Sequence, residues 1–203
     1  MKKIWKRIVL CAAVAGLFWS WGIIGDRQTL NRELIRLHVV ANSDSAGDQA
    51  IKLRVRDAVV ESLAADLAKV TDMDQAKAYI EKNLPKIQKT AIETLKALGC
   101  GDTAQVALQK EVFDTRYYDT FSLPAGVYEA LRITIGQGQG KNWWCVVFPS
   151  LCVPATSEGF DDVAAGAGFP EELTAALLGE RGYEVRFFFL DVLGRLEGYF
   201  FEG

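Results

Sequence analysis

Histidine and cysteine are scarce in this chain of 203 residues, which contains one histidine, His38, and four cysteines. A structural zinc site of the usual tetrahedral kind needs four such ligands at short, regular spacings. One histidine and scattered cysteines do not provide that pattern, so the sequence predicts no bound metal. No other cofactor motif is present, and we expect the protein to work without a cofactor.

A phosphate-binding loop is also missing, although the glycine-rich stretch GQGQGK at 136–141 resembles one at first sight. A Walker loop needs a glycine where Ile135 stands and a serine or threonine where Asn142 stands. A dinucleotide-binding GxGxxG pattern needs its third glycine where Lys141 stands if it starts at Gly136, or where Trp143 stands if it starts at Gly138. The stretch is therefore predicted to be a hairpin loop that joins strands at 127–135 and 143–148.

Positive charge is too sparse for nucleic-acid binding. Residues 26–203 carry 19 of the 23 Lys and Arg residues but all 26 Asp and Glu residues, which gives a net charge of −7. Contacts to phosphates require clustered cations, so we expect no nucleic-acid partner. This length is sufficient for one domain with its own hydrophobic core, and we predict a single domain over residues 33–203.

Charge is absent from residues 8–25, an apolar run that follows the short basic start at 1–7. This order is typical of an export signal, and about 18 residues is close to the lower limit for a membrane span. The positive-inside rule keeps the N-terminus in the cytoplasm and sends the rest of the chain across the membrane. Residues 1–25 are predicted to be a signal peptide or an uncleaved signal anchor, and the sequence leaves that choice open.

The remaining sequence alternates between strand and helix patterns in an order that indicates an α+β fold with a mainly antiparallel sheet. Ser45 and Asp48 form a capping box, Thr71 and Asp74 are expected to cap the next helix, and Pro85 is expected to end it and begin another. We expect strands at 35–41, 105–113, 127–135 and 143–148, and helices at about 46–69, 71–84, 85–98, 170–178 and 183–199.

The last predicted helix, at 183–199, has an apolar face. Its members are Val185, Phe188, Phe189, Val192 and Leu196, and Phe187, Leu190 and Leu193 widen it. The polar residues Arg186, Asp191, Arg195 and Glu197 sum to zero charge, which disfavours binding to an anionic lipid surface, so we expect the apolar face to pack against the sheet. The segment before it, 155–169, is rich in glycine, alanine and aspartate and is predicted to be a mobile loop.

Two cysteines near the last predicted strand are the candidate reactive groups. Cys145 or Cys152 could act as a nucleophile with His38 as its base, which would make the protein a cell-envelope cysteine hydrolase. Neither cysteine opens a helix and no local nucleophile signature surrounds them, so we expect no enzyme. In an exported protein Cys145 and Cys152 could instead form a disulfide or remain two buried thiols, and both possibilities stay open.

Three blocks of the sequence resemble the stage II sporulation protein R family: IRLHVVANSDSAGDQAIKLRVRDAV (35–59), LPAGVYEALRITIGQGQGKNWWCVVFPSLC (123–152) and EVRFFFLDVL (184–193). The resemblance implies a non-enzymatic signalling protein of endospore-forming bacteria, made in the forespore and exported into the space between forespore and mother cell. The implied partner is a membrane-embedded aspartic protease of the mother-cell membrane, which the signal activates to process the precursor of sigma factor E.

The resemblance suggests no contact residues, so candidate partner-binding positions come from the residues themselves. Adjacent tryptophans on a strand face opposite sides, so one can fill the core while the other anchors a partner. Helix capping alone is the alternative role for the ANSDS turn. We predict that partner binding involves His38, Asn42, Ser43 and Asp44 at one turn, and Asn142, Trp143 and Trp144 at the other.

Overall fold

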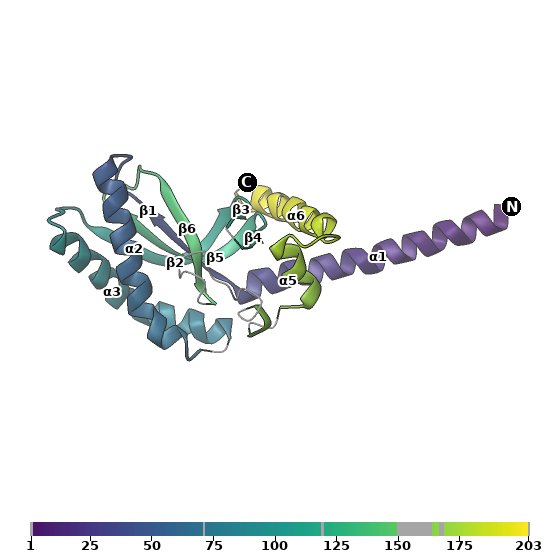
Figure 1. Cartoon of the computed structure of the whole chain (residues 1–203), viewed down its shortest axis with the longest axis horizontal. Helices are drawn as coiled ribbons and strands as arrows, with labels where there is room; N and C mark the ends of the chain where they lie inside the picture. The colour runs from purple at the N-terminus through teal and green to yellow at the C-terminus, as the bar shows by residue number, and fades with distance from the viewer. Residues whose placement is uncertain (1, 71, 119, 150–163, 167–168, 203) are drawn as a thin grey trace.

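The structure is a computed structural model that describes residues 2–70, 72–118, 120–149, 164–166 and 169–202. At its centre lies a four-stranded mixed sheet with the order β2-β5-β1-β6 (Figure 1). β1 pairs with β5 in parallel and with β6 in antiparallel orientation, and β2 pairs antiparallel with β5. The strands are β1 (Ile35–Val40), β2 (Ala104–Phe113), β5 (Gly126–Ile135) and β6 (Asn142–Phe148). The predicted α+β class and these four strands are confirmed.

The predicted hairpin between the last two strands is wrong, because β1 lies between β5 and β6. Residues 136–141 therefore cross over the end of β1 instead of joining neighbouring strands. All six residues of β1 are buried, including Arg36 and His38. This burial is explained by the central position of β1 in a sheet that is covered on both faces. A strand at the edge of the sheet would leave its outer edge open to water.

Two long helices, α2 (Ala46–Leu67) and α3 (Met73–Ala97), cover one face of the sheet (Figure 1). Ser45 begins α2 as predicted, because its hydroxyl accepts a hydrogen bond from Asp48 N at 3.1 Å. The core on this face joins apolar side chains of β1, β5 and both helices. The apolar stripe of each helix thus explains why it lies on the sheet.

The start of α3 differs from the prediction by one residue. Asp72 is the N-cap, and its carboxylate accepts a hydrogen bond from Gln75 N at 2.8 Å. Asp74 lies in the first turn instead, and Thr71 lies outside the described residues. Several residues with capping side chains stand in a row here, so the hydrogen bond alone decides which of them caps the helix.

α3 also continues through Pro85, so the two helices predicted here are one. Pro85 has no N–H to donate to the carbonyl of Glu81, but both residues lie on the exposed side of the helix, where water can bond that carbonyl. Ile80 and Ile87, on either side of the proline, are buried in the same core. Packing on the sheet therefore holds the helix continuous across a residue that interrupts its hydrogen bonds.

The second face of the sheet is covered by shorter elements and by the end of the N-terminal helix. The predicted helices at 170–178 and 183–199 are present, and the two-residue strands were not predicted because they are too short to show a pattern. Most of the predicted loop at 155–169 lies outside the described residues, and 164–166 are helical. The elements are β3 (Arg116–Tyr117), β4 (Ser122–Leu123), α5 (Glu171–Leu178) and α6 (Glu184–Glu202).

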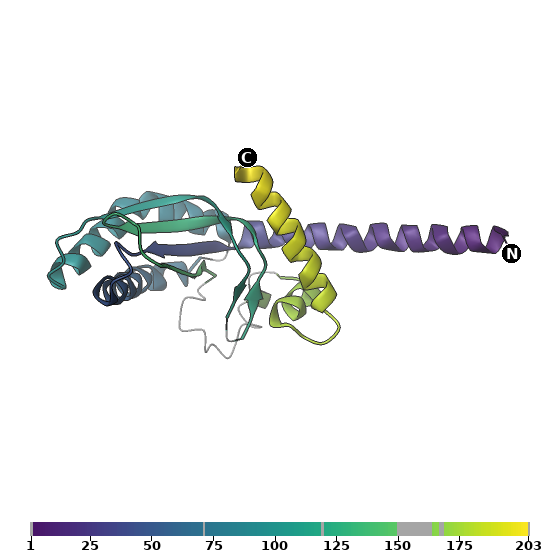
Figure 2. The same ribbon diagram turned by 90° about the horizontal axis from the view of Figure 1, so that it is seen from above.

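The N-terminal helix α1 (Lys2–Glu33) begins far from the sheet and ends at β1 (Figures 1 and 2). Its last turns belong to the domain, because Ile23 and Leu30 are buried there. Nothing in the sequence pattern predicted that the helix would run on from the apolar stretch into the fold. Among the helices of the described residues, none is both long enough and apolar enough to span a membrane.

α6 packs on the sheet as predicted, but through the side chains that widen its apolar face, Phe187, Leu190 and Leu193, and not through the centre of that face. Leu190 is fully buried, and the backbone at Gly194 approaches so closely that a Cβ there would lie 1.6 Å from Ala125 O. Phe188 and Leu196, from the face predicted to pack, are 60% and 50% exposed. Glycine allows a helix and a strand to come closer than any larger residue does, and this contact sets the rotation of α6.

Candidate functional site

The ANSDS turn at 41–45 and the glycine-rich loop at 136–142 meet at the end of β1, and we call these residues, together with Trp143 next to the loop, the turn cluster. The Asn42 side chain joins them, because its Oδ1 accepts a hydrogen bond from Gln137 N at 2.9 Å. Two backbone hydrogen bonds of 2.9 and 3.1 Å also run from the loop to the turn. The two predicted groups, far apart in the sequence, therefore form one surface.

The glycines of the loop are required by this contact and not by a phosphate. A Cβ at Gly140 would lie 2.3 Å from Ser43 O, and one at Gly136 would lie 2.3 Å from Asn42 Oδ1. Gly136 also has a φ of +56°, in the left-handed region that glycine adopts without strain. Close approach of the loop to the turn thus explains the glycine-rich sequence.

Asn42 and Ser43 use their side chains inside the protein. Asn42 Nδ2 and Ser43 Oγ both donate to Asp48 Oδ2. The hydrogen bond from Ser43 lowers the pKa of the Asp48 carboxyl, and Asn42 adds to this against the opposing effect of burial. These two side chains hold the shape of the turn cluster, and their part in partner binding stays a prediction.

The solvent-facing part of the turn cluster is polar and ends in an aromatic ring. Asp44, Lys141, Asn142 and Trp143 are all exposed. The Asp44 carboxylate accepts a hydrogen bond from Lys141 N at 2.6 Å, which holds the turn and the loop together at the surface. A rigid surface with an exposed tryptophan beside charged groups suits protein recognition.

The two tryptophans face opposite sides of the sheet, as predicted. Trp143 lies on the side of α2, 37% exposed, with the Arg56 guanidinium 4.2 Å from its ring centre. Trp144 lies on the second face, between the guanidinium of Arg116 at 3.5 Å and the ring of His38 at 5.6 Å. Trp144 is therefore a packed side chain, and Trp143 is the one available to a partner.

His38 is a buried member of the second face and not a free base. Its Nδ1 lies 2.6 Å from Glu111 Oε2 and its Nε2 lies 3.1 Å from Asn142 Oδ1. Burial raises the pKa of the Glu111 carboxyl, but the hydrogen bond and charge of His38 and the hydrogen bonds from Arg132 and Gln109 outweigh it. The pKa of Glu111 therefore lies below its ordinary value of 4.5.

We expect Glu111→Gln to lower the free energy of unfolding by about 1–2 kcal/mol at pH 7, because His38 and Arg132 lose a charged acceptor. A carboxyl whose pKa is lower in the folded state stabilises the fold above its unfolded pKa, and this is lost as the pH falls through the folded value. Urea unfolding between pH 7 and pH 3 should therefore show a shallower acid loss in the variant.

The matched control for this experiment is Glu93→Gln, which removes an exposed partner of Lys89 at 3.8 Å on α3. Exposed pairs of this kind contribute little, so this variant should follow the parent curve. An acid loss that is equally steep in Glu111→Gln and in the parent would show that another carboxylate is responsible.

The structure separates Cys145 from His38. Cys145 lies opposite Leu37 in the ladder and packs with it in the core under α2 and α3, whereas His38 faces the second side of the sheet. These two residues therefore cannot form a nucleophile and its base. Cys145 is disulfide-bonded and is not a free thiol. Cys152 lies outside the described residues, so the pairing of Cys145 with Cys152 stays one of the expectations from the sequence. The free cysteines of the described chain are Cys11 and Cys100.

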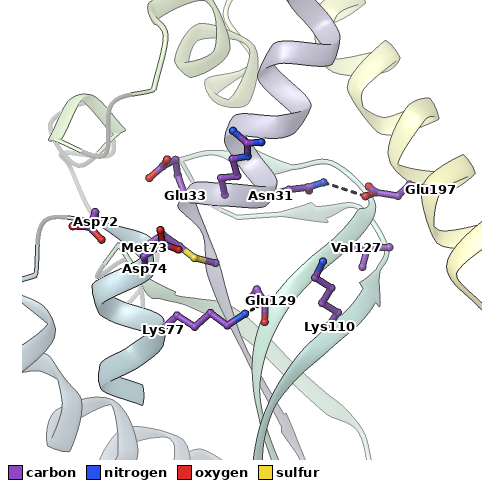
Figure 3. Close-up of a pocket in the computed structure, with 11 residues that line it drawn as sticks. Asn31, Glu33, Asp72, Met73, Asp74, Lys77, Lys110, Val127, Glu129 and Glu197 are labelled. Carbon is purple, nitrogen blue, oxygen red and sulfur yellow. Dashed lines mark hydrogen bonds and ion pairs between the residues drawn. The ribbon is translucent and has the colours of Figure 1, made fainter. Parts of the chain in front are cut away.

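Apart from the turn cluster, the structure contains a pocket that the sequence did not predict. It lies where α1, α3, β2, β5 and α6 meet, and it has a volume of about 490 Å³ (Figure 3). Lys77 points to Glu129 across it, 2.8 Å apart. Burial raises the pKa of the Glu33 carboxyl, and the charges of Asp72 and Asp74 add to this. The described residues hold no cluster suited to a metal ion. Both acidic and basic side chains line the pocket, so its lining does not favour one class of ligand. The lining residues come from segments that are far apart in the sequence, so they form no sequence motif.

The structure defines an α+β domain that carries a long N-terminal helix, with the turn cluster as its candidate binding surface. The family model "Stage II sporulation protein R (spore_II_R)" matches residues 31–158. Stage II sporulation protein R of Bacillus subtilis (strain 168) is 41% identical over 127 residues, which cover 63% of this chain and 57% of that relative. No solved structure matches. The chain therefore belongs to the stage II sporulation protein R family, which supports a role in sporulation.

Proposed function

We propose that this protein is an exported signal of endospore formation, without catalytic activity, that activates a membrane-embedded aspartic protease of the mother-cell membrane. The protease then processes the precursor of sigma factor E. Family membership supports the sporulation role. The observation that carries the proposal is the turn cluster, an exposed recognition surface that lies wholly within the matched residues 31–158.

Trp143 is the proposed anchor for the protease. Its ring is exposed and held by Arg56, so little freedom is lost when a partner covers it. Lys141 and Asp44 beside it offer charges of both signs, which favour a defined orientation over simple charge attraction. Asn142 is tied to His38, which links this surface to the packed second face.

The proposed location is the space between forespore and mother cell. The uncharged run at 8–25 follows four cations in the first seven residues, which is the arrangement of a segment that enters a membrane with the N-terminus inside. Residues 26–203 would then face the outer side of the forespore membrane. The chain would reach its receptor across this space while α1 holds it, or after cleavage of the apolar segment.

Reconstitution tests the proposal directly. The full chain is added to vesicles that contain the protease, and cleavage of the sigma factor E precursor is followed on a gel. We expect cleavage only when the chain is present. Unchanged cleavage by the protease without the chain, or no cleavage with a correctly folded chain, would contradict the proposed activation.

Within that assay we expect Trp143→Ala to raise the concentration of chain needed for half-maximal cleavage by about thirtyfold, the effect of losing a binding hot spot. Its thermal stability should stay close to that of the parent, because the ring is surface-exposed. Tyr117→Ala is the control, since Tyr117 is 77% exposed on β3, which follows the end of β2 opposite to the turn cluster. Equal activation by Trp143→Ala and the parent would place the receptor contact elsewhere.

A further inference from the structure

One face of α6 is apolar and largely exposed. We call it the outer stripe; its side chains are 50–78% exposed and lie on one side of the helix, at the three- and four-residue spacing of a helix face. A soluble domain rarely exposes so many large apolar side chains together unless the patch binds something. The outer stripe consists of Val185, Phe188, Leu196, Tyr199 and Phe200.

The rotation of α6 keeps this stripe outward. Gly194 and Gly198 lie on the opposite face, where an added Cβ would be 1.6 Å from Ala125 O and 2.8 Å from Val112 Cγ1. Because a backbone carbonyl and a strand side chain fill this space, a larger residue at Gly194 or Gly198 would push α6 away from the sheet. The outer stripe is therefore a fixed feature of the surface.

The charged side chains of α6 lie beside the stripe and are engaged with other groups. Arg186 pairs with Asp26 of α1 at 2.6 Å, and Glu197 pairs with Arg27 of α1 at 2.6 Å. Asp191 accepts a hydrogen bond from the backbone at Ala125. Within residues 185–200 no charge interrupts the stripe, so whatever covers it must be apolar over most of the contact.

α6 lies at the end of the domain from which α1 extends (Figure 1) and crosses α1 there at an oblique angle (Figure 2). The ion pair from Arg186 to Asp26 joins the two helices at the first charged residue after the uncharged run at 8–25. Trp21 and Ile24 on α1 are 80% and 50% exposed next to this junction. Both helices therefore carry exposed apolar side chains near the ion pair that joins them.

We infer that the outer stripe is a membrane-surface anchor that lies in the interfacial layer of a lipid bilayer. The inference depends on the proposal that residues 8–25 enter a membrane. If they do, the junction at Asp26 places α6 at the headgroup level and oblique to the membrane normal. A bilayer also fits a single protruding helix, because it requires no complementary groove, and rings of Phe and Tyr are favoured at that depth. The charged residues of α6 do not favour anionic lipid, so apolar contact provides the binding.

Photo-crosslinking in the full chain tests this inference. Phe188 or Phe200 is replaced by p-benzoylphenylalanine, and the chain is irradiated with vesicles of phosphatidylethanolamine and phosphatidylglycerol. The same probe at Leu98, exposed at the end of α3, is the matched control, and the probe at Trp21 reports on α1. A ring in the bilayer is favoured over water by more than about tenfold, so lipid adducts at 188 and 200 should exceed those at 98 by at least about that factor.

Each outcome has a distinct meaning. Lipid adducts at 188, 200 and 21 but not at 98 support both membrane placements. Adducts at 21 alone contradict the anchor on α6 and leave the placement of α1 intact, whereas no adducts at any position contradict both. Adducts to a second copy of the chain at 188 or 200 would identify the stripe as a dimer contact and overturn the inference. Equal lipid labelling at 98 would show random collision and would also overturn it.

Discussion

Gly194→Ala should strongly destabilise the domain, because the added methyl group meets backbone atoms that cannot move aside by themselves. The new Cβ would lie 1.6 Å from Ala125 O and 2.5 Å from Ala125 C, both backbone atoms of the segment that leads into β5. Overpacking of this kind costs about 3 kcal/mol when the backbone must move. We expect α6 to separate from the sheet, which would expose Leu190 and break the hydrogen bond from Ala125 N to Asp191.

Differential scanning calorimetry provides the measurement, with an expected fall in the melting temperature of about 6–12 °C. Gly25→Ala is the control, since Gly25 also lies within a helix but an added Cβ would meet nothing within 4 Å. That variant should be neutral or slightly more stable, because alanine is the better helix former. Equal melting of Gly194→Ala and the parent would show that α6 contributes little to the domain.

Gly140→Ala should disrupt the turn cluster. Its Cβ would lie 2.3 Å from Ser43 O, 2.6 Å from Ser43 C and 2.9 Å from Ala41 Cβ. The loop must retreat, and the hydrogen bond from Gly140 N to Ala41 O, now 2.9 Å, is lost with its neighbours. We expect a loss of about 2–3 kcal/mol in the free energy of unfolding.

The same variant should activate the protease poorly in the vesicle assay, because Lys141 and Trp143 move with the loop. Gly101→Ala is the control, since an added Cβ at Gly101 has open space around it. Melting temperature and half-maximal activation should be measured on the same preparations. Full activation by a Gly140→Ala chain that has lost the predicted stability would contradict recognition through the turn cluster.

Much of the local structure could be predicted from the sequence because its causes are local. The capping box at Ser45 and Asp48 begins α2 where expected, since the hydrogen bond joins residues three apart. The adjacent tryptophans face opposite sides because side chains on a strand alternate. Pro85 misled the prediction, because the burial of Ile80 and Ile87 on either side outweighs the missing hydrogen bond.

The candidate site was predicted in its members but not in its arrangement. Asn42 and Trp143 were chosen from separate turns, and the hydrogen bonds between 41–45 and 136–142 arise only because β1 enters the sheet between β5 and β6. β1 comes from the start of the domain but lies between two later strands. No pattern in the sequence that joins those two strands indicates this insertion. The hairpin was the expected connection because neighbouring strands in sequence usually pair.

The sequence by itself determined the family, the uncharged run at 8–25, and the four strands of the main sheet with most of the helices, because each depends on neighbouring residues or on blocks of residue choice. The tertiary structure alone decided which side of α6 is buried. Hydrophobic periodicity marks the stripe that includes Phe188 and Leu196, and it predicts that this stripe packs inward. The close approach of Gly194 to Ala125 turns it outward instead, because contact distance between backbones, which no pattern of hydropathy records, sets how a helix lies on a sheet.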